Sequence, residues 1–332
     1  MSHSIALHDA RHDALWDDLI GRSNGGTVMH SRRFLAYHGD RFQDESLCVW
    51  READVRLQAV LPLARSPVEA DVAVSHPGST FGGLIEDRID PATRAGLLSD
   101  IARLLLDRGY RRMIYKSVPA IFGGQFDESD LRLLMRVGTV RRSDLWNFVR
   151  LEQDHRMSPK RRASITAAAR KGVAVRQTES EADWIAFHNL LSANLASRHD
   201  AVPVHSLADM LSLRDRIVGE NALWLAIGPD GDMIAGTWYI AYNHRAVHTQ
   251  YIASNERGRA MGAVDYLLSA VMEQAKADGC RVFSFGINSL SDGYGVNTGL
   301  LKQKLRFGAG VCVHWHFDVD LALLARVDAG FA

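Results

Sequence analysis

The feature that most constrains the fold is the order of secondary-structure signals between Leu223 and Asp320. A strong hairpin signal at Pro229–Asp232 joins two predicted strands, and a third strand follows at Ala246–Ile252. A glycine- and arginine-rich turn then opens a long amphipathic helix, after which Arg281–Phe285 reads as another strand. Strands grouped around one long helix predict an α/β fold in which a sheet is flanked by helices.

The turn at the start of that helix is the clearest candidate binding site. A helix start carries backbone N–H groups without intrahelical partners and the positive end of the helix dipole, so it suits an anionic phosphate. Glycines in such a turn keep side chains out of the way of a pyrophosphate. We therefore predict cofactor binding at seven consecutive residues, with an ordinary glycine-bearing loop as the alternative. These residues are Arg257, Gly258, Arg259, Ala260, Met261, Gly262 and Ala263.

The length of the chain, 332 residues, fits two domains better than one core. The two halves also share a join in which a helix passes through a glycine into a strand, at Asp107–Met113 and again at Ala277–Phe283. This weak internal repeat indicates two copies of one α/β unit. We predict an N-terminal domain over residues 1–145 and a C-terminal domain over residues 146–332.

Charge and cysteine content limit the functional class. Lysine plus arginine equals aspartate plus glutamate at 39 each, which weighs against a dedicated nucleic-acid binder. The three cysteines are scattered and form no disulfide framework or metal knuckle, as in a reducing compartment. Because neither a signal peptide nor an apolar spanning segment is visible, the sequence predicts a cytoplasmic protein.

Three segments resemble the FemAB-like branch of the GNAT acyltransferases. They are the basic run Arg161–Val175, the strand-to-turn segment Tyr251–Leu267, and the tail Gly299–Ala309 with its Gly-Leu-x-x-x-Lys-x-x-Phe-Gly-Ala pattern. Members of this family have two tandem GNAT folds and modify cell-envelope precursors. The resemblance implies two GNAT-like domains with mixed twisted sheets, a degenerate N-terminal copy, and acetyl-CoA or another acyl-CoA as cosubstrate. Ala260 stands where the family turn has its first glycine.

Transfer of an acyl group to an amine requires the amine to lose a proton as it attacks, and a nearby general base would help. Ligands of open α/β sheets bind beyond the carboxyl ends of strands, which favours Tyr251, Asp292 and Tyr294 over the mid-strand His248. Lys304, within the family-like tail, could neutralise a phosphate or a developing oxyanion. The alternatives are a solvated cationic face around Lys304 and catalysis by positioning alone, without a side-chain base.

Two further basic or polar segments have both a functional and an ordinary interpretation. The run Lys160–Arg162, with Arg170 and Lys171, could meet phosphates of a sugar nucleotide, a lipid pyrophosphate or tRNA, or could be a solvated helix face. The loop His76–Gly83 could line an acceptor cleft or could be a long surface loop.

Val311–Asp320 alternates between apolar and polar residues, with His314, His316 and Asp318 on its polar face. Histidine and aspartate on one face could ligate a metal. A half-buried strand with a solvated polar face is the favoured interpretation, so we predict no metal site.

The predicted function is therefore an acyl-CoA-dependent N-acyltransferase that moves an acyl group, most simply acetyl, to an amine. The expected acceptor is an amino-sugar, sugar-nucleotide or lipid-linked glycan precursor of the cell envelope or an exopolysaccharide, with peripheral inner-membrane contact through that substrate. One alternative is an aminoacyl-tRNA-dependent transferase acting on a peptidoglycan precursor. Another is a degenerate GNAT pair that serves as a scaffold in polysaccharide assembly. The sequence leaves the acceptor, the acyl chain and the oligomeric state open.

Overall fold

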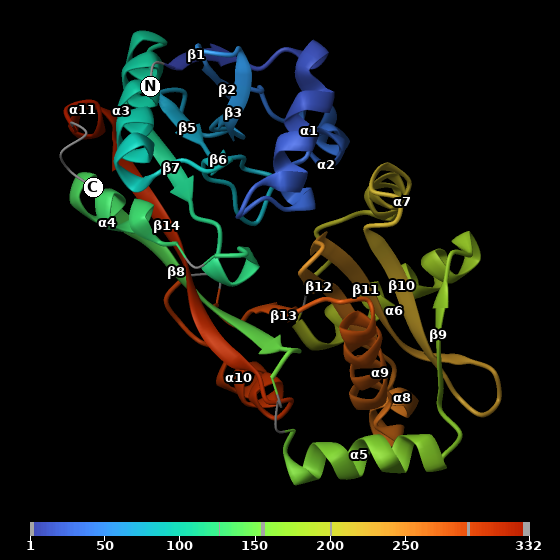
Figure 1. Ribbon diagram of the computed structural model, residues 1–332. Helices are drawn as coiled ribbons and strands as arrows, with labels where there is room; N and C mark the ends of the chain where they lie inside the picture. Colours follow the sequence, from blue (N-terminus) through green and yellow to red (C-terminus); the bar gives the residue numbers. More distant parts are fainter. Residues whose placement is uncertain (1–2, 126, 154–156, 200, 291–292, 328–332) are drawn as a thin grey trace. The chain divides into compact units, whose positions relative to one another are not determined.

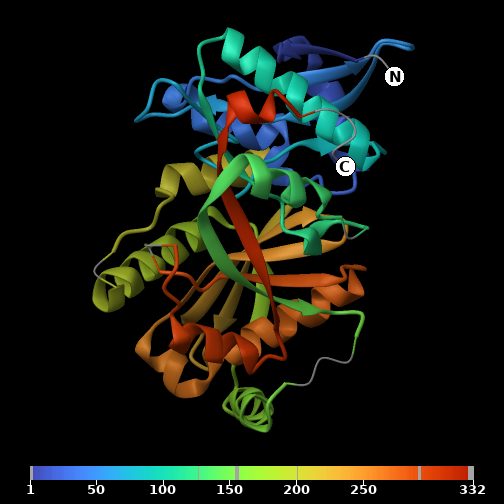
Figure 2. The same ribbon diagram turned by 90° about the vertical axis from the view of Figure 1, so that its left-hand side faces the viewer.

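The computed structural model describes residues 3–125, 127–153, 157–199, 201–290 and 293–327 (Figures 1 and 2). Its contacts divide the chain into two compact units. The first consists of Met1–Asp144, Ser291–Gly295 and Val313–Ala332, and the second of Leu145–Leu290 and Val296–Cys312. Two short segments from the predicted C-terminal domain are thus grouped with the first unit. The predicted boundary between two domains, 1–145 and 146–332, stays a prediction.

The first unit holds two sets of paired strands. One set is antiparallel in the order β1-β2-β3-β6. In the other, β4 pairs with β5, β5 runs parallel to β7, and the end of β14 pairs with β7. The strands are β1 (His3–Leu7), β2 (Leu47–Arg51), β3 (Arg56–Leu61), β4 (Ala64–Arg65), β5 (Val72–Val74), β6 (Ile85–Glu86), β7 (Arg112–Lys116) and β14 (Gly310–Asp320). The helices are α1 (Asp13–Arg22), α2 (Arg32–Leu35), α3 (Pro91–Asp107), α4 (Ser129–Val137) and α11 (Leu321–Leu324).

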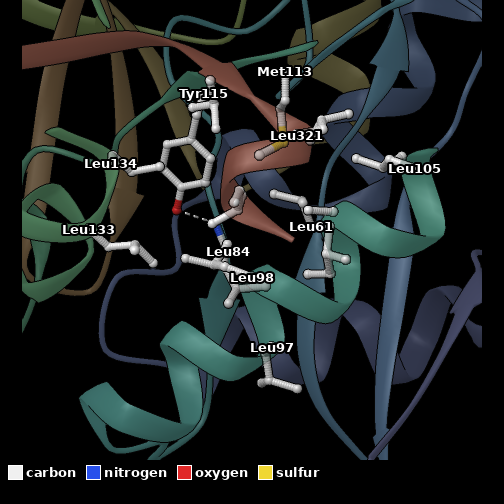
Figure 3. Close-up of a cluster of buried hydrophobic side chains, with 14 of the residues drawn as sticks. Leu61, Leu84, Leu97, Leu98, Leu105, Met113, Tyr115, Leu133, Leu134 and Leu321 are labelled. Atoms are coloured by element: carbon white, nitrogen blue, oxygen red, sulfur yellow. Dashed lines mark hydrogen bonds between the residues drawn. The ribbon is translucent and has the colours of Figure 1, made fainter. Parts of the chain in front are cut away.

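Leucines dominate the core of the first unit, where α3, α4 and α11 cover β7 (Figure 3). The start of α3 has the usual features of a helix N-terminus, because Pro91 occupies the first turn and the Asp90 side chain accepts a hydrogen bond from Thr93 N at 3.0 Å. Tyr115 is a polar residue within this core, and its hydroxyl accepts a hydrogen bond from Leu84 N at 2.9 Å. That bond satisfies a backbone donor of a buried residue.

In the second unit, neighbouring strands follow the order β8-β13-β12-β11-β10-β9, and β8 belongs to this unit from Leu145 on. β12 and β13 are parallel, and the other neighbouring strands are antiparallel. The strands are β8 (Gly138–Arg150), β9 (Ala174–Thr178), β10 (Asn221–Ile227), β11 (Met233–Asn243), β12 (Ala246–Ser254) and β13 (Val282–Ile287). The helices are α5 (Pro159–Arg170), α6 (Glu181–His199), α7 (Leu207–Arg216), α8 (Glu256–Met261), α9 (Ala263–Ala277) and α10 (Thr298–Leu305). The predicted α/β class is confirmed.

Helices cover both faces of this sheet (Figures 1 and 2). On one face, Leu267 and Val271 of α9 pack with Ala235 of β11. The next residue of β11, Gly236, faces the opposite side, where the ring of Phe187 from α6 lies so close that an added Cβ would be 2.6 Å from it. Because successive side chains of a strand point to opposite faces, the two helices lie on opposite sides of the sheet.

The segment predicted as a turn before α9 is itself mostly helical. Residues Glu256–Met261 form α8, whose start is capped by the Asn255 side chain, which accepts a hydrogen bond from Gly258 N at 2.8 Å. Gly262, at a φ of 74°, then ends α8 and begins α9. The predicted strand-to-helix connection is present, but the sequence reading overlooked Asn255 as a helix cap.

The described residues contain no helix that combines the length and the apolar character needed to cross a bilayer. Cys48, Cys280 and Cys312 are not joined to one another by disulfide bonds.

We predict that Tyr115→Phe destabilises the protein by about 1–3 kcal/mol, because it leaves the buried N–H of Leu84 without its acceptor. Tyr294→Phe serves as the matched control, since Tyr294 is 65% exposed, and should change stability by less than about 0.5 kcal/mol. Urea unfolding followed by circular dichroism measures both effects. Equal stability of wild type and Tyr115→Phe would show that this hydrogen bond contributes nothing net.

Candidate functional site

The two parallel strands at the centre of the second unit separate along their length. β12 and β13 pair only through Ala246–His248 and Val282–Ser284 among the described residues, although both strands continue further. The pairing of β12 with β11 also shifts register, so that Gln250 is left as an extra residue. Such a bulge bends a strand and is common beside active sites. The carboxyl ends of β12 and β13 are thus free to border a ligand site.

A cavity of about 430 Å³ lies at these strand ends. This volume is within the range of small-molecule sites, and the position beyond strand carboxyl ends is the usual one in open α/β sheets. From the strands the cavity is lined by Ile252, Ala253, Ser254 and Phe285. From the helices and their connections it is lined by Arg161, Ser164, Asn194, Gly258, Arg259, Gly262, Val264, Asp265, Leu268, Leu300, Gln303, Lys304 and Phe307.

Three of the seven residues predicted to bind a cofactor line this cavity: Gly258, Arg259 and Gly262. Arg259 donates from its guanidinium to Ser254 O at 2.7 Å, which holds this cation beside the end of β12. The start of α9, at Gly262, has no side-chain cap in the described part of the chain. Its first N–H groups therefore form a positive helix end that is available to an anion.

The other four predicted residues lie elsewhere. Arg257 pairs with Asp230 and Asp232 in the hairpin between β10 and β11. Ala260 is exposed, and its carbonyl accepts a hydrogen bond from Lys171. Met261 and Ala263 pack against the hydrophobic core of the second unit, which explains why both side chains are apolar.

The glycines of this segment are required by packing. A Cβ on Gly258 would lie 2.2 Å from the carbonyl oxygen of Ile234, a contact that no side chain can make. A Cβ on Gly262 would lie 2.6 Å from Ser164 Oγ, and the positive φ of this residue also favours glycine. Their presence alone therefore does not establish a phosphate site.

Lys304 contributes a buried amine to the cavity wall. Its side chain is 7% exposed, and Nζ donates to Gly286 O at 3.1 Å and to Ile287 O at 2.8 Å. Burial lowers the pKa of Lys304 to about 7. Its neighbours Lys302 and Arg306 are exposed. The alternative of a solvated cationic face therefore holds for these two residues and not for Lys304.

The sequence-based site prediction missed Arg161 and Asp265. They form an ion pair at the cavity wall, and Arg161 also donates to Gln303 O at 2.9 Å. The guanidinium carbon of Arg161 lies 4.1 Å from the ring centre of Phe307. These contacts join α5, α9 and the end of α10. In the sequence, Arg161 was one cation among several, and only its place in the family-like run distinguished it.

The four residues predicted to be catalytic differ in their positions. Lys304 lines the cavity, whereas the hydroxyl of Tyr251 lies 2.8 Å from His205 Nδ1. Burial raises the pKa of Tyr251, so this phenol stays protonated at neutral pH. Tyr294 belongs to the first unit and donates to Arg141 O at 3.2 Å. Asp292 lies outside the described residues.

His248, which the sequence ranked below these four, is fully enclosed. Its Nδ1 lies 3.0 Å from Ser284 Oγ. Burial, assisted by the charge of Lys304, lowers the pKa of His248 to about 3, so its ring is neutral. The histidine therefore supports the wall behind Lys304 without adding charge.

The loop His76–Gly83 is not the long surface loop that the sequence left open. His76 and Ser79 are buried, and their carbonyl oxygens accept hydrogen bonds from the Lys116 ammonium. Burial lowers the pKa of Lys116 to about 7, as it does for Lys304. Each unit thus contains a buried lysine held by two backbone carbonyls.

Comparison with known proteins bears on the family and the fold. The family model described as "Acetyltransferase (GNAT) domain" matches residues 156–294. Among solved structures, FemX has a TM-score of 0.70 at 12% identity, with 96% of this chain and 97% of FemX covered. L-PGS from Bacillus licheniformis has a TM-score of 0.59 at 14% identity, covering 96% and 97%. No curated protein gives a match.

A third solved structure is a tandem GNAT protein from the clavulanic acid biosynthesis pathway, with a TM-score of 0.52 at 12% identity and coverage of 96% and 99%. At such identities these structures establish the fold alone. Residues 156–294 are therefore similar to a GNAT acetyltransferase domain, and the fold is similar to that of a tandem GNAT protein over nearly the whole chain. The predicted resemblance and fold are confirmed.

The buried state of Lys304 predicts a pH-dependent stability. Because its pKa falls from 10.5 to about 7 on folding, the unfolded chain binds more protons between these values, and the contribution of Lys304 to stability rises with pH. Lys304→Met removes this contribution. The free energy of unfolding of Lys304→Met relative to wild type should fall by up to about 1.4 kcal/mol per pH unit between pH 7 and pH 9.

Denaturant unfolding at several pH values measures this slope, and Lys302→Met is the matched control because Lys302 is exposed on the same helix. A parallel pH dependence of wild type and Lys304→Met would mean that Lys304 stays charged in the folded protein.

Proposed function

We propose that this chain is an N-acyltransferase that binds acyl-CoA in the cavity between the separated ends of β12 and β13. The observation that carries this proposal is the meeting of the α8–α9 connection, Arg259 and Lys304 at that cavity. Two cations and an uncapped helix start suit a pyrophosphate, while Phe285 and Leu268 offer apolar surface to the rest of the cosubstrate. Acetyl is the simplest acyl group for this volume.

The reaction needs few protein groups. The amine nitrogen of the acceptor attacks the thioester carbonyl, the C–N bond forms, the C–S bond breaks, and the amine proton leaves while the thiolate of CoA takes up a proton. Lys304 in its ammonium form would stabilise negative charge that develops on the carbonyl oxygen or the sulfur. Tyr251, Asp292 and Tyr294 remain proposed participants, and among the candidates that fall within the described residues Lys304 lines the cavity while Tyr251 and Tyr294 do not.

The proposed acceptor is an amine on a sugar precursor of the cell envelope or an exopolysaccharide. This part rests on the resemblance to the FemAB-like proteins and on the FemX-like fold. An acceptor presented on a lipid would bring the protein to the inner face of the membrane. The cytoplasmic location is part of the same proposal.

A second candidate is aminoacyl transfer from tRNA. It is favoured by α5, on which Lys160, Arg162 and Arg170 are all exposed close to Arg161 of the cavity wall. Exposed cations along one helix suit a nucleic-acid backbone. The formal net charge of zero gives this candidate no long-range attraction to RNA.

The decisive experiment is a thiol-release assay with acetyl-CoA and a panel of amino sugars, sugar nucleotides and lipid-linked amino sugars, with mass spectrometry of the product. Amine-dependent release of CoA is expected. Activity that depends on an added aminoacyl-tRNA and is lost on RNase treatment would favour the second candidate. Calorimetry that shows binding of neither acyl-CoA nor tRNA would point to a scaffold and overturn the enzymatic proposal.

Arg259 and Arg257 allow a matched test of the binding site, because they are two residues apart on α8 and only Arg259 lines the cavity. Arg259→Gln should weaken acetyl-CoA binding by about 10-fold, the loss of one charge-assisted contact. Arg257→Gln, whose parent side chain pairs with Asp230 and Asp232, should leave the affinity within about twofold. Isothermal titration calorimetry measures both, and equal weakening by the two variants would contradict the assigned geometry.

A further inference from the structure

A second cluster of chemically reactive side chains lies in the first unit, away from the residues used above. His314 and His316 are on β14, and Asp144 is on β8. One ligand atom from each of the three residues lies within 4.8 Å of the other two. His314 is fully buried and Asp144 is 3% exposed, so this is not a set of surface groups that happen to be near one another.

The distances suit one small cation. His316 Nε2 lies 3.3 Å from His314 Nδ1 and 3.8 Å from Asp144 Oδ2. In a tetrahedral zinc site with bonds of about 2.0–2.1 Å, neighbouring ligand atoms are about 3.3 Å apart. The two imidazole nitrogens, which are within hydrogen-bonding distance of each other, are therefore already separated by the edge of such a tetrahedron. The carboxylate would have to move closer to complete a third position.

The carboxylate is held in place by a hydrogen bond. Arg142 Nε donates to Asp144 Oδ2 at 2.7 Å. The other oxygen, Oδ1, is buried and makes no hydrogen bond to any residue that the structure describes. An unsatisfied buried carboxylate oxygen is costly, and a bound cation would satisfy it.

Positive neighbours oppose a cation here. Lys116 and Arg142 both act on His316, and Arg141 does so more weakly. The ammonium of Lys116 is already held by two carbonyl oxygens. The guanidinium of Arg142 is engaged with Asp144 itself. The bonds from the two imidazoles and the carboxylate to the metal would have to offset the remaining repulsion.

We propose that His314, His316 and Asp144 form a binding site for a divalent transition metal, with Zn²⁺ as the best match to two imidazoles and one carboxylate. Such a metal would connect β14 to β8 within the first unit and would have one position left for water. This proposal reverses the expectation of a metal-free strand with a solvated polar face. Asp144 could not be identified as a ligand from the sequence, because it is 170 residues or more from both histidines.

The test uses the full-length chain without a histidine tag, treated with EDTA and then titrated with Co²⁺ and with Zn²⁺. We expect one Co²⁺ per chain with the intense visible absorption of a tetrahedral site, displaced by Zn²⁺, and an increase in melting temperature on addition of Zn²⁺. Failure of the wild-type chain to bind one equivalent at micromolar metal would overturn the proposal without reference to any variant.

Two variants locate the site. His316→Gln and Asp144→Asn should each weaken Co²⁺ binding at least about tenfold. Removal of a residue that only supports a metal ligand already costs about this much affinity, so removal of a ligand should cost no less. His244→Gln, which changes an exposed histidine of the second unit, is the matched control and should bind as wild type does. Circular dichroism checks that each variant is folded. Binding that survives both substitutions would place the metal elsewhere and overturn the assignment.

Discussion

The candidate active site depends on the loss of strand pairing between β12 and β13. A parallel pair that stayed hydrogen-bonded to its ends would fill the space that the cavity occupies. The pairing stops after His248 and Ser284, and Gln250 forms a bulge on the opposite edge of β12. Backbone groups that would otherwise satisfy each other are thereby left at the rim of a cavity. The end of pairing between β12 and β13 therefore both shapes the sheet and opens the candidate site.

Buried charges hold the surrounding helices at this opening. The pair of Arg161 and Asp265 connects α5 with α9, and the lysine of α10 is fixed by the carbonyls of Gly286 and Ile287. Charged groups are costly to bury unless they are paired or hydrogen-bonded, so each helix has few alternative positions. The same contacts keep two cationic side chains, Arg259 and Lys304, beside the start of α9.

Much of the fold was predictable because local signals and tertiary packing agree. Pro91 and Pro159 mark helix starts, and the alternating residues of β14 identify a strand. The order of elements after Leu223 was enough to predict β10, β11, β12 and β13 and the connection into α9. The short α8 was overlooked because six residues carry little periodicity and its cap, Asn255, looked like part of a loop.

The site was less predictable, because it depends on which side of an element a residue faces. Neighbouring arginines on α8 look alike in sequence, yet Arg257 joins a hairpin and Arg259 borders the cavity. The burial of Lys304, and of His314 on a strand face expected to be solvated, is decided by elements distant in the chain. Only spatial neighbours such as Gln303 and Asp144 reveal what these residues can do.

The most direct measurement is a crystal structure of the protein with coenzyme A. The expected result is electron density for the pyrophosphate within hydrogen-bonding distance of the backbone amides at the α8–α9 connection, with the pantetheine arm between the ends of β12 and β13. Coenzyme A bound at another surface, or a cavity that stays unfilled at saturating ligand, would contradict the assignment of this opening as the acyl-donor site.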